Sequence, residues 1–532
     1  MSLGRTRSVA LTGLEGAVVS VEADLAQGLP HFAVSGLPDT ACAQSTDRVK
    51  AATANSGMPL PQRRITVNLS PASIPKAGSG FDVSIAVAVL VACGAVPGAV
   101  AERVVHLGEL GLDGSIRPVR GVLPSVLAAS GAGVADVVVP IENAAEASLV
   151  PGVRVHALPD LSSLVAHYAL AQDGRLPDAA LPERRGARPP ATAAVRDLAD
   201  VVGQPEARLA LELAAAGGHH LFLMGPPGAG KTMLAERLVS ILPTLGRDQA
   251  LDVLAVRSIL GALPGEVGID GQPPFVAPHH SASMTAIVGG GSGLIRPGAI
   301  SQAHHGVLFL DEAPEFKVSV LQALRQPLES GEVVVARARH SVRFPARFQL
   351  VMAANPCPCG LGFGKGVDCS CLPRERRAYA AKLTGPLLDR VDLQVVMPAI
   401  NLAALGQEPG ESSAVVAARV ARARAVQGER WGGERWSLNG QASGSALRRG
   451  RWRLGRSITV DLDRALDRGL ITLRGSRGHR ALVAEGERQA QVVAVRGCAA
   501  GQVGDGPAEP QHTVVTPQRD QPTVQSTRVS GS

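Results

Sequence analysis

Short apolar runs that end abruptly at glycine or acidic residues are the most regular hydrophobic pattern of this chain. The run 220–224 predicts a buried strand, and the spacing of apolar positions over 233–238 predicts an amphipathic helix after it. Two further runs, 307–310 and 348–354, also predict buried strands. Buried strands that alternate with helical patterns indicate an α/β fold with a parallel sheet.

The turn between the first strand and its helix has the spacing GxxxxGK[ST]. Its glycines let backbone N–H groups surround phosphate oxygens, and the helix N-terminus adds partial positive charge. A glycine-rich turn that binds nothing is the alternative, and the flanking strand and helix speak against it. We expect the lysine to reach the β- and γ-phosphates of ATP and the threonine to bind Mg²⁺. The turn consists of Gly225, Pro226, Pro227, Gly228, Ala229, Gly230, Lys231 and Thr232.

Polar residues follow the other two strands directly. Asp311 and Glu312 end the run 307–310, and Asn355 ends the run 348–354. Because the carboxyl ends of parallel strands meet at one edge of the sheet, we expect all three beside the phosphates. Asp311 is expected to hold Mg²⁺ through water, Glu312 to polarise the attacking water and Asn355 to help place it. This arrangement predicts an ATP hydrolase.

Composition excludes some protein classes. The chain has 532 residues, 45% of them hydrophobic, and a net charge of +7, which is compatible with nucleic-acid binding without proving it. The longest apolar stretch, 83–93, is shorter than the roughly 20 residues that span a bilayer, and predicts a buried helix. Residues 1–5 lack the apolar core of a signal peptide, so we expect a cytoplasmic protein without membrane contact.

Composition also divides the chain. Residues 1–170 read as a β-rich first domain, and the Pro-, Arg- and Ala-rich residues 171–191 as an exposed linker. The nucleotide-binding domain is expected over 192–400 and a helical region over 401–475. Residues 476–532 have no amphipathic period and read as a disordered tail.

Five sequence blocks, in their order along the chain, resemble the AAA+ ATPases related to magnesium chelatase, and within them the ComM/YifB-like group. The resemblance implies a hexameric homo-oligomer with ATP sites between subunits. It also implies that Asn355 is the first sensor and Arg390 the arginine finger of a neighbouring site, although Arg390 could instead pair with Asp389 or Asp392. The blocks are 202–207, 277–281, 296–306, 354–360 and 385–393.

The first domain resembles the Lon-protease-type α+β domain of this group. Peptide hydrolysis there needs a serine and a lysine in contact. Gly80 stands at the serine position and Leu123 at the lysine position, while Ser79 is one residue out of register. We therefore expect a non-proteolytic domain that binds DNA or organises the ring.

Two segments predict hairpins. The first segment is 287–297. In chelatase-like relatives a hairpin at this position is inserted into the second helix and projects toward the pore of the ring. The second spans about 333–344 and carries Arg337, Arg339, His340 and Arg343. Basic side chains on pore loops contact the phosphate backbone of single-stranded or branched DNA, whereas a solvated charged turn is the alternative.

Four of the seven cysteines lie close together in sequence. Cys357, Cys359, Cys369 and Cys371 have the spacing CxC-x9-CxC, which suits tetrahedral Zn²⁺, with free thiols as the alternative. Histidine pairs at 279–280 and 304–305 could also suggest a metal, but we expect them to support the nucleotide domain.

An ATP-driven DNA motor, acting in branch migration or as a helicase during recombination or transformation, is the leading hypothesis. The alternatives are the ATPase subunit of a tetrapyrrole magnesium chelatase and an ATP-dependent protease, which the lost dyad disfavours.

In relatives, the segment matching 465–475 leads into an arginine-bearing lid helix that carries the second sensor. In this chain, the sequence from Ser476 onward differs from that of the relatives. A shifted reading frame or a naturally divergent tail would explain this difference. We therefore expect an incomplete lid and impaired ATP turnover.

Overall fold

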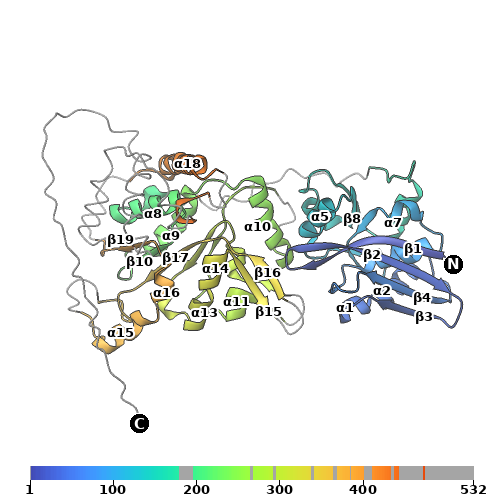
Figure 1. Ribbon diagram of the computed structural model, residues 1–532, viewed down its shortest axis with the longest axis horizontal. Helices are drawn as coiled ribbons and strands as arrows, with labels where there is room; N and C mark the ends of the chain where they lie inside the picture. Colours follow the sequence, from blue (N-terminus) through green and yellow to red (C-terminus); the bar gives the residue numbers. More distant parts are fainter. Residues whose placement is uncertain are drawn as a thin grey trace, which may run out of the picture.

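The protein contains two mixed α/β units, seen side by side in Figure 1. The structure is a computed structural model that describes residues 2–178, 196–263, 268–291, 295–336, 341–362, 368–383, 385–400, 410–432, 437–441 and 471–473. Most of the expected linker and all of the expected tail lie outside these residues.

The N-terminal unit is built on a seven-stranded mixed sheet with the order β3-β4-β2-β1-β5-β8-β9. The first two strands form a long antiparallel hairpin, with pairs from Ser2↔Leu25 to Thr12↔Glu15. β2 also pairs antiparallel with β4, and the other neighbours are parallel. The strands are β1 (Ser2–Thr12), β2 (Glu15–Ala26), β3 (His31–Ser35), β4 (Arg64–Ser70), β5 (Val104–His106), β8 (Asp136–Pro140) and β9 (Arg154–Leu158), with a small separate pair, β6 (Glu109–Leu110) and β7 (Ile116–Arg117).

Helices bury the faces of this sheet. α3 (Asp82–Ala92) confirms the helix expected from the apolar stretch, and nearly all its side chains are buried because it packs on β1 and β2. An apolar helix of this kind belongs in a core. The other helices are α1 (Thr40–Ala43), α2 (Ser45–Asn55), α4 (Gly98–Ala101), α5 (Val122–Gly131), α6 (Ala144–Ala147) and α7 (Leu161–Ala169).

The second unit contains a six-stranded sheet with the order β11-β14-β17-β10-β18-β19. All neighbours are parallel except β18 and β19. The three buried strands expected from the sequence are confirmed as the adjacent strands β14, β17 and β10. The strands are β10 (Leu221–Met224), β11 (Phe275–Val276), β14 (Val307–Leu310), β17 (Gln349–Ala354), β18 (Leu393–Val396) and β19 (Ile471–Leu473).

Both faces of this sheet are covered, which explains why its strands read as continuous apolar runs. Leu221 and Leu223 face a core with α8, α9 and α18, whereas Phe222 faces a second core with α12 and α13. The helices of this unit are α8 (Pro205–Gly217), α9 (Lys231–Ile241), α10 (Arg247–Leu260), α11 (Met284–Val288), α12 (Ala299–Gln302), α13 (Val318–Ala323), α14 (Arg325–Ser330), α15 (Pro373–Ala381), α16 (Gly385–Leu388) and α18 (Ser413–Arg430).

Both expected hairpins are present. β12 (Gly289–Gly290) pairs antiparallel with β13 (Arg296–Pro297) between α11 and α12. β15 (Glu332–Ala336) pairs antiparallel with β16 (Ser341–Pro345), and Val333 lies opposite Phe344. Arg337, Arg339 and His340, which follow β15 in the sequence, lie outside the described residues.

Helix α10 joins the two units, and Figure 1 shows it standing between them. Leu251, Leu254 and Ala255 of α10 belong to the same apolar core as α5 of the N-terminal unit. The Ser258 hydroxyl donates to the buried Glu146 carboxylate, and Arg247 Nη2 donates to Leu149 O at 3.0 Å. The units therefore share a packed interface through this helix.

The C-terminal part corrects one expectation. Residues 401–475 were expected to be helical, and α18 does form there, but Ile471–Leu473 is a strand that pairs antiparallel with β18. Without this strand β18 would form the edge of the sheet, and the backbone groups of an edge strand are available to pair with a further strand. Among the described residues, no helix is long and apolar enough to cross a membrane.

Candidate active site

The loop between β10 and α9 has the backbone of a phosphate-binding turn. The backbone φ angles of Gly228 and Gly230 are +77° and +84°, values that residues with a side chain rarely adopt. Helix α9 begins directly after them, at Lys231. Apart from the glycine itself and its two chain neighbours, no described residue has an atom within 4 Å of a Cβ built at either position. The loop is therefore open on that side, at the positive end of a helix dipole.

Lys231 connects this loop to the neighbouring strand. Its ammonium group donates to Gly225 O at 2.8 Å, to Pro226 O at 2.9 Å and to the Asn355 side-chain oxygen at 3.0 Å. The side chain is largely buried, and this burial lowers the pKa of Lys231 against the opposing effect of Asp311 and Glu312. The structure therefore brings Lys231 and Asn355 together, as the sequence predicted.

Thr232 and Asp311 form a second contact beside the loop. The Thr232 hydroxyl donates to the Asp311 carboxylate at 2.6 Å, so a helix start and a strand end supply two adjacent oxygen atoms. Hydroxyl and carboxylate oxygens of this kind suit Mg²⁺, which also retains water ligands. The pair therefore fits the ion that the sequence predicted here.

Glu312 follows in a left-handed backbone conformation, with φ 49° and ψ 45°. Its backbone N–H donates to Asp311 Oδ1 at 2.9 Å. Its exposed carboxylate lies 3.2 Å from Nδ1 of His280, which follows strand β11. The side chain thus has one defined partner at the edge of the sheet.

Arg390 lies after α16 and contacts neither aspartate that the sequence offered as its partner. Its Nη2 pairs instead with the Glu329 carboxylate of α14, and its Nη1 donates to Pro386 O at 2.5 Å. Burial and the nearby Arg325 lower the pKa of Arg390. Asp392 is occupied elsewhere, because it accepts from His220 N at 3.0 Å and lies 3.3 Å from His219.

The hairpin residue Arg343 is exposed on β16. Its Nη1 lies 3.3 Å from Glu332 Oε2 on the opposite strand. The hairpin also approaches the N-terminal unit, because a Cβ at Gly13 would lie 2.7 Å from Arg343 O and from Val342 Cγ1. The turn between β1 and β2 therefore touches the hairpin.

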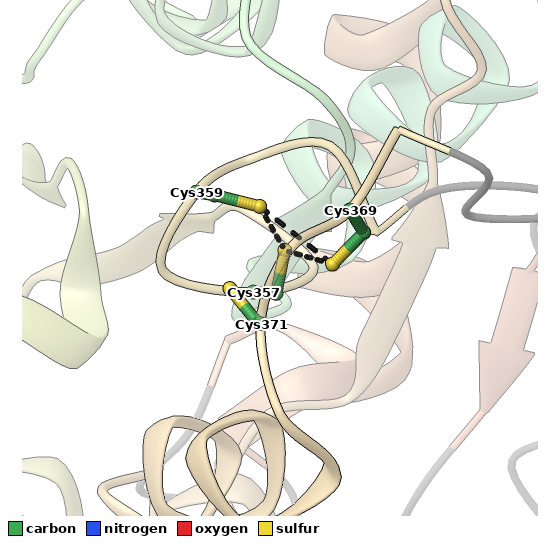
Figure 2. A group of neighbouring side chains, drawn as sticks. All are labelled: Cys357, Cys359, Cys369 and Cys371. Carbon is green, nitrogen blue, oxygen red and sulfur yellow. Dashed lines mark hydrogen bonds between the residues drawn. The ribbon is translucent and has the colours of Figure 1, made fainter.

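The four clustered cysteines are brought together from two segments (Figure 2). Cys357 Sγ lies 3.3 Å from Cys359 Sγ and 3.6 Å from Cys369 Sγ, and the last two sulfur atoms are 3.6 Å apart. Together with Cys371, all four sulfur atoms lie within 4.8 Å of one another.

The residues that the sequence compared with a protease dyad have other partners in the N-terminal unit, and the non-proteolytic role of this domain stays a prediction. The Ser79 hydroxyl contacts the Glu109 carboxylate, and the amine of Lys76 donates to Pro71 O. Leu123 is fully buried in α5. None of these contacts places a lysine amine on a serine hydroxyl.

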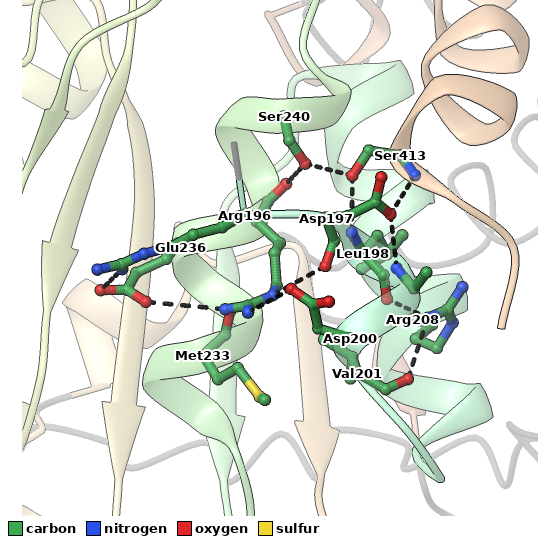
Figure 3. Close-up of polar contacts among 12 residues, drawn as sticks. Arg196, Asp197, Leu198, Asp200, Val201, Arg208, Met233, Glu236, Ser240 and Ser413 are labelled. Atoms are coloured by element: carbon green, nitrogen blue, oxygen red, sulfur yellow. Dashed lines mark hydrogen bonds and ion pairs between the residues drawn. The ribbon is translucent and has the colours of Figure 1, made fainter. Parts of the chain in front are cut away.

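A polar network attaches α18 to the phosphate-loop helix (Figure 3). The Ser413 hydroxyl, at the start of α18, accepts from Leu198 N at 2.7 Å and lies 2.6 Å from the Ser240 hydroxyl of α9. Arg237 of α9 reaches back to Asp200 at 2.9 Å. A displacement of α18 would therefore act on the helix that begins at Lys231.

Three protein-family models match this chain. The models "Subunit ChlI of Mg-chelatase", "Magnesium chelatase, subunit ChlI" and "Magnesium chelatase, subunit ChlI C-terminal" match residues 21–143, 197–405 and 410–482. The competence protein ComM of Haemophilus influenzae is 41% identical over 443 residues, 82% of this chain and 85% of ComM. The chain belongs to the ComM/YifB-like family of magnesium-chelatase-related proteins.

Two other members of this family extend the match. The uncharacterized protein YifB of Escherichia coli is 40% identical over 441 residues, 81% of this chain and 83% of YifB. An uncharacterized protein of Mycobacterium tuberculosis is 49% identical over 477 residues, 89% of this chain and 92% of the relative. The family places an AAA+ domain of the magnesium-chelatase type over the second unit.

Sequence reasoning missed two partners of the site in this ComM/YifB-like chain. It assigned His280 a general supporting role, and the contact with Glu312 appears only when β11 and β14 pair. It also missed Glu329 as the partner of Arg390. The sequence offered a signal for His280, because the histidine pair follows a short apolar run that indicates a strand. It offered no signal for Glu329.

Proposed function

We propose that this ComM/YifB-like protein hydrolyses ATP at the β10–α9 loop. The proposal rests on the ammonium group of Lys231, which donates to loop carbonyls and to Asn355. The Thr232–Asp311 pair lies beside it. An incoming phosphate competes for the lysine ammonium group, while Asn355 and Glu312 place and polarise the attacking water. Bound Mg²⁺ would neutralise charge on the phosphates.

We further propose that Arg390 acts on the ATP of a neighbouring subunit in a hexameric ring. Within one chain its guanidinium pairs with Glu329, whose side chain is well exposed. The γ-phosphate of an adjacent subunit would compete with this carboxylate for the guanidinium. An arginine supplied in this way neutralises charge that develops in the transition state, an effect of about 10³–10⁵ in turnover.

The proposed substrate of the motor is single-stranded or branched DNA, in the cytoplasm. Support comes from the net charge of +7, from the basic residues of segment 333–344 and from the match to a relative named a competence protein. A pore loop that contacts phosphates would hold DNA without reading its sequence. If ATP hydrolysis moves a loop that holds the DNA phosphates, the protein can drive branch migration or act as a helicase.

The ATPase subunit of a tetrapyrrole chelatase remains the second candidate, because all three matching family models carry the chelatase name. The ComM and YifB relatives, however, match over most of their own lengths. This coverage favours the DNA-directed function.

DNA-stimulated ATP hydrolysis tests the proposal. The ATPase rate is measured with single-stranded, branched and duplex DNA, and separately with a magnesium-free porphyrin. We expect stimulation by single-stranded or branched DNA that falls steeply as salt rises, because phosphate contacts release counterions. A rate that no DNA changes would overturn the DNA-directed function.

The hairpin is tested separately. Replacing Arg337, Arg339 and Arg343 by alanine should weaken DNA binding and flatten its salt dependence. The matched control replaces three exposed arginines of α15, Arg374, Arg376 and Arg377. Equal DNA affinity of the two variants would remove the hairpin from the interface.

A further inference from the structure

The four-cysteine cluster has the dimensions of a metal site. A tetrahedral zinc ion with Zn–S bonds of about 2.3 Å places its sulfur ligands about 3.8 Å apart. The shortest separations between the cysteines are 3.3–3.6 Å, and all four sulfur atoms lie within 4.8 Å. Figure 2 shows the side chains converging from both segments on one point.

Neither a disulfide nor ordinary packing accounts for this arrangement. A disulfide bond is about 2.05 Å long, and the measured separations exceed it by more than 1 Å. Gly362 N donates to Cys357 Sγ at 3.2 Å, the kind of backbone contact that stabilises a metal-bound thiolate. Three of the sulfur-bearing residues are only partly buried, so hydrophobic burial alone does not explain why they converge.

The cluster lies against the candidate active site. Asn355, which accepts from Lys231, stands two residues before Cys357. Gly360, the residue directly after Cys359, lies so close to Pro227 of the phosphate loop that a Cβ there would be 2.6 Å from Pro227 Cγ. Tyr379 of α15, just after the second pair, is buried and hydrogen-bonds to the backbone of Asn355.

We propose that Cys357, Cys359, Cys369 and Cys371 bind one zinc ion, and that this ion holds Asn355 and Gly360 against the phosphate loop. The ion ties the segment after β17 to the segment before α15. Without it, the two segments lose their common anchor, and Asn355 is no longer held at Lys231. The second part of this inference rests on the proposed ATP hydrolysis, whereas the first does not.

Metal content tests the first part. The full chain, purified without chelators, should contain one zinc per protomer by elemental analysis. Exchange with Co²⁺ should give the thiolate charge-transfer and ligand-field absorption of a tetrahedral site. Replacing Cys369 and Cys371 by serine should abolish both signals, whereas Cys93→Ser, at an exposed cysteine in the N-terminal unit, should change neither. Four titratable thiols in the cluster without bound metal would overturn the site.

Hydrogen exchange and kinetics test the second part. In the Cys369→Ser, Cys371→Ser variant, exchange should rise over 225–230 and 354–362 but not in α8, whose protection also shows that the second unit remains folded. kcat for ATP should fall by more than tenfold, and Cys93→Ser should leave it unchanged. Unchanged exchange at 225–230 together with normal kcat in a zinc-free variant would overturn the coupling. If no form hydrolyses ATP, the proposed function fails, while metal content and exchange still decide the site.

Discussion

Glu312 combines two features that point to a functional carboxylate. It occupies the left-handed region of the backbone, which costs a non-glycine residue about 1–3 kcal/mol and is retained mainly at functional sites. Its carboxylate stays exposed and contacts His280. This residue directly follows Asp311, which meets Thr232 at the edge of the sheet.

Replacing Glu312 by glutamine should separate ATP binding from hydrolysis. The amide keeps the size of the side chain but cannot accept a proton from water, so kcat should fall by at least about 10²-fold. Binding of a fluorescent ATP analogue should persist, in contrast to Lys231→Ala, which should lose it. Near-normal hydrolysis by the glutamine variant would refute the assigned role.

His280 is expected to position Glu312. His280→Leu should lower kcat by about 10- to 100-fold with little change in KM, because a misplaced catalytic group affects the reaction more than binding. His280→Asn, which retains a hydrogen-bond donor, should recover part of this loss. The neighbouring His279 contacts Ser281 at 2.7 Å, so His279→Leu serves as control. Equal effects of the two leucine variants would argue against a specific role for His280.

Between secondary-structure elements, the histidine pair 304–305 joins the starts of strands β14 and β17. His304 Nδ1 accepts from Arg347 N at 3.0 Å, and His305 N donates to Arg347 O at 2.7 Å. The His305 side chain lies 3.4 Å from Asp252 of α10, the helix that packs on the N-terminal unit. The strands that end in Glu312 and Asn355 are thereby connected at their other ends to the interface between the units.

Acid should destabilise the second unit through His304. Burial lowers the pKa of His304 from 6.5 to about 3. Below pH 6.5 the unfolded chain therefore binds a proton that the folded chain does not, and stability falls as pH drops from 6.5 toward 3. Between pH 7 and 5 this difference amounts to about 2 kcal/mol for one group.

His304→Asn isolates this contribution, because its amide oxygen can still accept from Arg347 N. Urea unfolding at pH 7 and pH 5 should show a smaller loss of stability for the variant than for the parent protein. The same loss in both proteins would show that His304 does not carry the pH dependence.

In the proposed ring, each ATP site would combine groups from two subunits. If Arg390 serves a neighbour, Lys231→Ala and Arg390→Ala variants are each inactive alone but complement one another. In an equal mixture, about one quarter of random interfaces combine an intact loop with an intact arginine. ATPase activity should therefore reappear on mixing and be absent when either variant is mixed with itself. No recovery in mixed oligomers, verified by differential tagging, would contradict the shared site.

The impaired lid expected from the sequence after Gly475 stays a prediction, since those residues lie outside the described part of the chain. The C-terminal family model matches as far as residue 482. All residues of the candidate active site lie well before that point.

Local patterns were sufficient for the elements of the site. The strands at 221–224, 307–310 and 349–354 and the helix that begins at Lys231 follow from hydrophobic period and glycine spacing, which short-range backbone sterics impose. The meeting of Asp311, Asn355 and Lys231 followed too, because parallel strands end at one edge. The CxC spacing likewise indicated the cysteine cluster.

Contacts between distant segments did not follow from such patterns. The pairing of Arg390 with Glu329, the addition of Ile471–Leu473 to the sheet and the packing of α10 on the N-terminal unit each join segments with no common period. The approach of Gly360 to Pro227 is of the same kind. Such contacts depend on strand order and on the sum of many weak packing interactions, so they exist only once the whole chain has folded.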